Sequence, residues 1–416
     1  MSYLTAGLPG TGGAIKVTPE DFCVHEAPLY EASGEGSHLY VHIEKRGMPT
    51  FEAVRRLAKA LGVRERDVGC AGLKDARSVS RQWLSVEHID RERVLDLDLP
   101  GLTVLEAKAH RNKLKLGHLA SNRFEVVVRG AEDAAARVPP ILDVLRRRGV
   151  PNWFGAQRFG ARGITHLLGE ALLRRDYDAF LQQLLGGDES LDTSPALAEA
   201  RRLFNGGDRA AALETMPNKM RVEKKALHAL VRYGDAKRAT FAVPTTMRRL
   251  YVCAFQSRLF NRILEARLDG VDRLQEGDLA LLHRNGGVFR VRSVADEQPR
   301  CDAFEISPSG PMFGTRSIVA EGEPGRLERA TLDATGLGLR DFNVGSGIRL
   351  QGARRALRVP LAEVSFEPMD DAYRVAFRLP PGSFATVVLR ELMKTADVDS
   401  ATPRPPARTG DFSDTL

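Results

Sequence analysis

Residues 68–88 read "VGCAGLKDARSVSRQWLSVEH", two strand-like apolar runs on either side of a polar bend. Lys74 and Asp75 lie next to each other at the bend, and residues 81–88 predict the strand that leaves it. Small or amidated polar side chains follow the bend: Ser78, Ser80 and Gln82. Such a segment is typical of a solvated surface turn, but a carboxylate in a bend between strands can also serve as a nucleophile. The surrounding sequence is needed to separate these interpretations.

The segments around this bend predict an α+β fold. Residues 38–45 ("HLYVHIEK") alternate apolar and polar side chains, which is typical of a half-buried strand, and residues 51–61 repeat apolar side chains at helical spacing. Residues 102–111 and 123–130 predict further strands. The order of these elements predicts a mixed, mainly antiparallel sheet with helices on one face.

The middle of the chain differs in pattern from its two ends. Helical periodicity recurs there in four segments: 164–185, 197–204, 221–233 and 246–268. We therefore predict one α+β domain in two parts, residues 1–157 and 336–396, which is interrupted by a mostly helical insertion over residues 158–335. Residues 397–416 are polar and proline-rich, and we predict that they form a disordered tail.

Composition and missing motifs exclude several classes of protein. The chain has 416 residues and four well-separated cysteines, with no Cys-x-x-Cys spacing that would suggest a zinc or disulfide framework. No apolar run approaches the ~18–20 residues of a transmembrane helix. A Walker A motif, a Gly-x-Ser-x-Gly motif and a dinucleotide-binding glycine pattern are also absent from the sequence. We expect no secretory signal, because the first residues do not show a basic segment followed by an apolar one. We expect a cytoplasmic protein without membrane attachment, metal or small-molecule cofactor.

Positive charge is concentrated in one stretch of the predicted insertion. The formal net charge of the whole chain is +7, whereas residues 221–262 contain ten basic and two acidic residues, a local balance of +8. A concentrated positive field attracts polyanions, and each phosphate that it neutralises adds salt-sensitive affinity. A solvated helical face is the alternative explanation.

Seven short segments occur in a characteristic order along the chain: "IKVTPEDFCVHE" (15–26), "GLKDARSVSRQ" (72–82), "SNRFEVVVR" (121–129), "PNWFGAQRFG" (151–160), "SRLFN" (257–261), "GPMFG" (310–314) and "GSFATVVLREL" (382–392). This series closely resembles the TruD family of tRNA pseudouridine synthases, and the resemblance spans roughly residues 14–394. It implies an isomerase without a cofactor, whose catalytic domain is split by an inserted TRUD domain. The two-part organisation predicted from composition agrees with this.

The resemblance assigns Asp75 as the catalytic aspartate. It also implies substrate contacts for three aromatic residues and one amide: Phe22, Phe124, Phe384 and Asn122. Phe124 is the residue expected to stack on a flipped base, although core packing is the alternative for Phe22 and Phe124. A cation is expected beside Asp75, and Lys16 and Lys74 compete for this place. Because adjacent residues of an extended strand point to opposite faces, we favour Lys16 and treat Lys74 as a substrate contact.

The expected partner is tRNA, bound by a monomer, and the family's target is uridine 13 in the D-arm. Gln157 and Arg158 lie at the predicted domain junction and are candidates to order the RNA site, with helix packing as the alternative. Candidates for phosphate contacts in the basic stretch are Arg221, Lys224, Lys225, Arg248 and Arg249.

The implied reaction breaks the N1–C1′ bond of uridine and joins C5 to C1′. Asp75 either attacks C1′ or assists a glycal-like intermediate by proton abstraction, and the sequence leaves both routes open. Two other classes of protein compete with this enzyme as interpretations of the sequence. A deaminase or methyltransferase needs a zinc set or a glycine-rich cofactor loop, which the sequence does not contain. A non-catalytic RNA-binding protein would use the same basic stretch without Asp75 chemistry.

Overall fold

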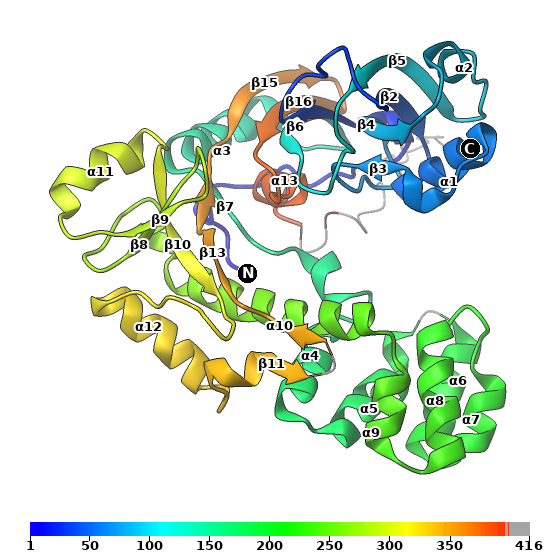
Figure 1. Cartoon of the computed structure of the whole chain (residues 1–416). Helices are drawn as coiled ribbons and strands as arrows, with labels where there is room; N and C mark the ends of the chain where they lie inside the picture. Colours follow the sequence, from blue (N-terminus) through cyan, green and yellow to red (C-terminus); the bar gives the residue numbers. More distant parts are fainter. Residues whose placement is uncertain (193, 346, 396–397, 399–416) are drawn as a thin grey trace, which may run out of the picture. The chain divides into compact units, whose positions relative to one another are not determined.

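The computed structural model describes residues 1–192, 194–345, 347–395 and 398 (Figure 1). The chain forms two compact units. The first, here called the sheet unit, comprises Tyr3–Val150 and the described residues from Val359 onward. The second, the insert unit, comprises Met1–Ser2 and Pro151–Arg358. The predicted disordered tail, 397–416, lies outside the described residues apart from Val398.

The insert unit is wider at both ends than the predicted range of 158–335. The physical reason is non-local pairing. Strand β13 (Ala353–Ala356) pairs antiparallel with β10 (Ile306–Met312), which draws the segment after 335 into the insert. At the other end, Asn261 accepts from the amide of Phe154 at 3.0 Å and donates to its carbonyl at 2.9 Å. A domain boundary drawn from sequence composition cannot detect these contacts, because they join segments far apart in the chain.

An eight-stranded sheet organises the described part of the sheet unit, in the order β15-β16-β6-β1-β4-β2-β5, with β3 paired to β4. β1 and β4 run parallel and the other neighbouring strands run antiparallel, which confirms the predicted mixed, mainly antiparallel sheet. The strands are β1 (Phe22–Pro28), β2 (His38–Arg46), β3 (Gly69–Cys70), β4 (Val79–Glu87), β5 (Leu102–His110), β6 (Leu119–Arg129), β15 (Ala362–Met369) and β16 (Ala372–Leu379).

Four α-helices of the described residues belong to the sheet unit: α1 (Thr50–Leu61), α2 (Arg91–Leu95), α3 (Ala134–Arg148) and α13 (Ala385–Met393). α1 buries Val54, Leu57 and Leu61, the apolar positions of its helical repeat, in one cluster with β2, β4 and β5. Each such side chain contributes about 1.5–3 kcal/mol when it leaves water. Gly62 ends α1 because its φ of 72° is in the left-handed region that glycine adopts without strain.

Strand register places the apolar core and a row of polar groups on the same face of this sheet. Val24 of β1 lies opposite Ser80 of β4 and Phe124 of β6, and Ser80 lies opposite Lys45 of β2. Directly opposed residues project to the same side, and the side alternates along each strand. Glu26, two residues after Val24, therefore projects to this face as well. The face thus carries buried charges beside its apolar side chains.

The insert unit is mostly helical and contains a four-stranded sheet of order β13-β10-β8-β9 (Figure 1). Gly169 lets two of its helices approach closely, because a Cβ there would lie 2.1 Å from the carbonyl oxygen of Tyr251. The helices are α4 (Thr165–Arg174), α5 (Tyr177–Leu185), α6 (Pro195–Asn205), α7 (Arg209–Thr215), α8 (Arg221–Tyr233), α9 (Ala236–Ala242), α10 (Thr245–Ala266), α11 (Val294–Asp302) and α12 (Gly322–Asp333). The other strands of this unit are β8 (Leu279–Leu282), β9 (Val288–Arg290), β11 (Asn343–Gly345) and β12 (Ile348–Arg349). β7 (Val150–Pro151) and β14 (Arg358–Val359) each have one residue in either unit. Among the described residues, no helix is both long and apolar enough to cross a membrane.

Candidate active site

Asp75 projects from the bend that precedes β4, and its carboxylate is 45% exposed. The Nζ of Lys16 lies 3.0 Å from its Oδ2, and the Lys16 side chain is only 7% exposed. The ammonium group is therefore held against the protein while the carboxylate faces solvent. Lys16, not Lys74, is the cation beside Asp75, in line with the preference drawn from strand alternation.

The segment that carries Lys16 is fixed on both sides. Lys16 has a φ of 56°, a left-handed conformation that is uncommon for a residue with a Cβ and is a form of strain found at functional sites. Before it, the amide of Ala14 donates to the carbonyl of Arg129 at 2.8 Å. After it, the Arg129 guanidinium lies 2.7 Å from the buried Asp21 carboxylate. Burial alone would raise the pKa of Asp21, but the bonds from Arg129 and from the Thr18 amide outweigh it and lower the pKa.

Lys74 points away from Asp75 into a buried polar cluster. Its Nζ lies 2.7 Å from Oε2 of Glu26 and donates to Oδ1 of Asn122 at 2.7 Å. The Lys74 and Glu26 side chains are 6% and 0% exposed. The other Glu26 oxygen accepts from the amide of Trp83 at 3.2 Å. Lys74 thus fixes the orientation of the Asn122 amide, which the resemblance implicates in nucleotide binding.

The polar residues after the bend are not solvated. Ser78, Ser80 and Gln82 are fully buried, and the Ser78 and Ser80 hydroxyl oxygens lie 2.9 Å apart. Thr50 connects this row to the bend, because its hydroxyl donates to Gln82 Oε1 at 2.9 Å and accepts from the amide of Lys74 at 2.8 Å. A surface turn would leave these groups in water. Because they are buried, these side chains contact the bend from the interior of the protein.

Two of the three predicted aromatic contacts lie mainly in the core. Phe22 and Phe124 are 3% and 8% exposed, and their ring centroids are 6.1 Å apart in an edge-on arrangement. The Lys16 ammonium group also lies over the Phe22 ring, with its Nζ 4.6 Å from the ring centroid. Phe384 differs, because it is 38% exposed as the N-cap residue of α13. Phe384 follows β16, whose last residue, Leu379, lies opposite Asn122.

The structure places the predicted RNA-contacting residues in the insert unit, in two kinds of environment. Arg158 Nε donates to the Ser257 hydroxyl at 3.0 Å, and its guanidinium lies over the Phe154 ring. Gln157 belongs to the same short 3₁₀ turn, Ala156–Phe159. Within the basic stretch, Lys224 is half-buried. Three other predicted phosphate contacts are exposed: Arg221, Lys225 and Arg249.

Arg248 requires a correction. It is 4% exposed, and its guanidinium donates to the Val243 carbonyl at 3.0 Å and to the Thr245 hydroxyl at 3.1 Å. The same group lies 4.5 Å from the centroid of the Phe241 ring, and burial lowers its pKa. Arg248 therefore packs α10 against the segment before it, and we remove it from the predicted phosphate contacts.

Two residues of this site were not among the predicted site residues. Glu26 stands in the first motif segment, on the strand face that it shares with Phe22 and Val24. Lys45 ends the alternating run of β2 on its inward face and is fully buried. A charged residue at an inward position of an amphipathic strand is the signal that would have identified both of them.

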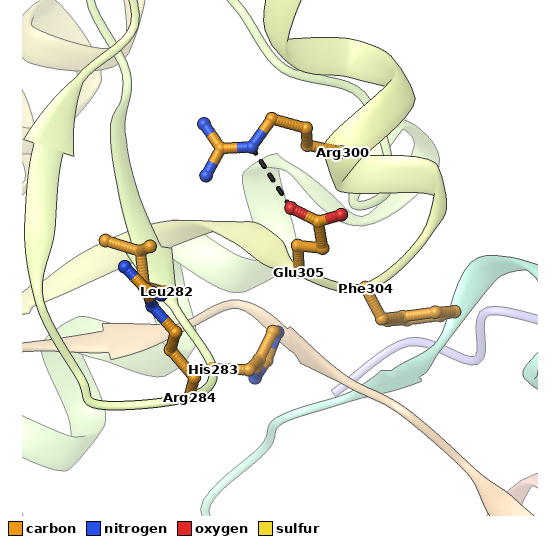
Figure 2. Close-up of a pocket in the computed structure, with 6 residues that line it drawn as sticks. All are labelled: Leu282, His283, Arg284, Arg300, Phe304 and Glu305. Atoms are coloured by element: carbon orange, nitrogen blue, oxygen red, sulfur yellow. Dashed lines mark hydrogen bonds and ion pairs between the residues drawn. The ribbon is translucent and has the colours of Figure 1, made fainter.

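A separate hollow of about 420 Å³ lies in the insert unit, lined by β8, α11 and the loops that follow them (Figure 2). Its carboxylate, Glu305, is bound by Arg300, whose Nε lies 3.2 Å from Oε2. His283 contacts the Ser307 hydroxyl at 2.9 Å through Nε2. None of the predicted site residues lines this pocket, so the candidate active site is the Asp75 site of the sheet unit.

Comparison with known proteins identifies the class as the pseudouridine synthases, isomerases that modify RNA. The family described as tRNA pseudouridine synthase D (TruD) matches residues 1–392. The chain therefore belongs to the TruD family of tRNA pseudouridine synthases, which confirms the predicted family and enzyme class.

Curated relatives and a solved structure agree with this membership. A tRNA pseudouridine synthase D of Geotalea daltonii is 48% identical over 395 residues, covering 94% of this chain and 99% of that one. The corresponding protein of Geobacter metallireducens is 50% identical over 394 residues, covering 94% and 97%. A crystal structure of a putative tRNA pseudouridine synthase D from Methanosarcina mazei superposes with a TM-score of 0.80 at 27% identity, covering 95% and 96% of the two chains. The shared architecture confirms the α+β fold.

Proposed function

We propose that this enzyme converts uridine 13 in the D-arm of tRNA to pseudouridine, with Asp75 as the catalytic carboxylate. The observation that carries the proposal is the solvent-facing Asp75 carboxylate held by the buried Lys16 ammonium group at 3.0 Å. Lys16 is placed to hold this carboxylate in position when a bound nucleotide displaces water from the site.

The chemistry needs a nucleophile or base and no electron carrier. The N1–C1′ bond breaks, the uracil turns within the site, and C5 bonds to C1′ before the C5 proton is lost, so atoms and electrons balance within the nucleotide. Asp75 can act by covalent attack at C1′, as carboxylates do in glycosyl transfer. It can also remove the C2′ proton of the ribose as the N1–C1′ bond breaks, which forms a glycal-like intermediate, and return this proton when C5 bonds to C1′.

The target base must leave its stack before either route can begin. Base extrusion costs a few kcal/mol, and stacking on an aromatic ring returns roughly 1–3 kcal/mol. Phe384 offers the exposed ring for this contact, while Phe124 lies mainly in the core. Asn122, oriented by Lys74, supplies a polar group for the nucleotide.

The exposed basic residues of α8 and α10 are proposed to bind tRNA phosphates. Replacing Lys225 and Arg249 together with glutamine removes two cations, which is expected to weaken tRNA binding and to reduce the slope of log K against log salt by about 2. Binding isotherms at several salt concentrations measure this slope. The matched control is Arg248→Met, which removes a buried guanidinium group. The slope of log K against log salt for this variant should equal that of the wild type. An unchanged slope in the Lys225/Arg249 double variant would exclude these helices from the phosphate contacts.

The substrate assignment is tested by mapping pseudouridines in tRNA from cells that lack this protein. Loss of pseudouridine 13 alone, restored by the wild-type gene, is the expected result. The persistence of pseudouridine 13 together with loss at another position would show that the family membership holds but the proposed target does not.

A further inference from the structure

Lys45 lies directly beneath the bend that carries Asp75. It is 0% exposed at the end of β2, on the inward face of the sheet. Its Nζ donates to the backbone carbonyl of Asp75 at 2.8 Å and to the carbonyl of Met48 at 2.7 Å. The Ser80 hydroxyl lies 3.5 Å from the same nitrogen. The lysine therefore joins the loop, the end of β2 and the start of β4.

The three acceptors of Lys45 are neutral, so the ammonium group is buried among them without a carboxylate in its hydrogen-bonding shell. Burying a charge among neutral acceptors is costly. Burial lowers the pKa of Lys45 to about 8. The charged groups that act on it are Asp75, which raises its pKa, and Lys74, which lowers it. A costly buried charge that contacts the catalytic loop indicates a function beyond packing.

A second donor reaches the same carbonyl. The Ser78 hydroxyl donates to the Asp75 carbonyl at 3.0 Å, and it lies 2.9 Å from the Ser80 hydroxyl. The carbonyl of Asp75 is thus held by two side chains from below, while its carboxylate is held from the side by Lys16. The backbone and the side chain of one residue are fixed independently.

We propose that Lys45 is a positioning residue, which with Ser78 clamps the Asp75 carbonyl and so aims the Asp75 carboxylate at the ribose of the target uridine. This inference rests on the proposed function of Asp75. It concerns the rate of the chemical step and not the affinity for tRNA, because Lys45 is fully buried and cannot contact the substrate.

The first test replaces Lys45 with methionine, which keeps the length of the side chain and removes its donors. A misplacement of the reacting group by about 1 Å costs on the order of 10²-fold in rate. We therefore expect kcat to fall about 10²-fold, with KM for tRNA within threefold of the wild type and with a melting temperature lowered by the loss of a donor to two backbone carbonyls. Lys59→Met, at an exposed position of α1, is the matched control and should keep the wild-type kcat.

The second test is a double-mutant cycle with Ser78→Ala. Because both donors bind one acceptor, the two substitutions are expected to be non-additive, with the double variant little slower than Lys45→Met alone. Additive effects would mean that the two residues act separately, which would overturn the clamp.

The third test measures the pH dependence of kcat in the wild-type protein, so it requires no substitution in the core. Below its pKa of about 8 Lys45 donates as a cation, and above it as a weaker neutral amine, so kcat of the wild type should decline as pH rises through about 8. This decline should be absent from the residual activity of Lys45→Met. A wild-type kcat that stays flat from about pH 7 up to the ordinary range of a lysine, about pH 10, would overturn the inference even if Lys45→Met did not fold.

The kcat assay also distinguishes a failure of the proposed function of Asp75 from a failure of the positioning role of Lys45. If Asp75→Asn is active, the proposed function of Asp75 fails and the positioning role fails with it. If Asp75→Asn is inactive while Lys45→Met keeps kcat within threefold of the wild type, the proposed function stands and only the role of Lys45 is overturned.

Discussion

Asp75→Asn is expected to abolish pseudouridine formation while tRNA binding and folding stay intact. The amide keeps the shape of the side chain but cannot act as a nucleophile or a base, and loss of such a group costs roughly 10⁴-fold or more in kcat. The Asp75 side chain is 45% exposed, so its substitution creates no cavity. The substituted amide oxygen can still accept from the largely buried Lys16 ammonium group, so the free energy of unfolding is expected to fall by no more than about 1–3 kcal/mol.

Three measurements on the same preparation check this result: pseudouridine formed in bulk tRNA, the Kd for tRNA, and the melting temperature. Glu65→Gln is the matched control, because it neutralises an exposed carboxylate of the same unit and should leave all three unchanged. Product formation by Asp75→Asn above about a hundredth of the wild-type rate would contradict the catalytic assignment. A wild-type protein that binds tRNA but forms no pseudouridine would instead favour the non-catalytic RNA-binding alternative.

The fold was largely predictable because its signals are local. The alternation of "HLYVHIEK" and the helical repeat of α1 both follow from side chains that must enter one apolar cluster. The limits of the insertion were not predictable in the same way. They depend on the pairing of β13 with β10 and on the contacts of Asn261 with Phe154, which join segments far apart in the chain.

The cation beside Asp75 was predicted from the opposite directions of neighbouring side chains. Lys16 lies beside Asp75 and Lys74 points away from it, although the bend that carries Lys74 and Asp75 is not part of a strand. Strand alternation marks Lys45 as an inward charge, but its acceptor is a loop carbonyl, whose position no periodicity specifies. Arg248 was misassigned for a related reason: a run of basic residues locates a positive region, but helix packing decides which of its side chains face solvent.

Lys74→Met is expected to destabilise the protein strongly and to slow the reaction as well. The substitution leaves the Glu26 carboxylate buried, at 0% side-chain exposure, without its cation at 2.7 Å. Breaking a buried pair by removing one partner costs about 3–5 kcal/mol, which is a large fraction of the stability of an ordinary domain. Asn122 also loses the donor that orients its amide, so kcat/KM should fall together with stability.

The double variant Lys74→Met/Glu26→Gln separates these two effects. Glutamine removes the buried charge and can keep the bond that Glu26 accepts from the amide of Trp83. Urea unfolding should therefore recover most of the lost free energy in the double variant, because no uncompensated charge remains. Activity should stay low, because Asn122 still lacks its donor. If activity returns in step with stability, Lys74 is only a structural partner of Glu26; if stability does not return, the buried pair is not the source of the loss.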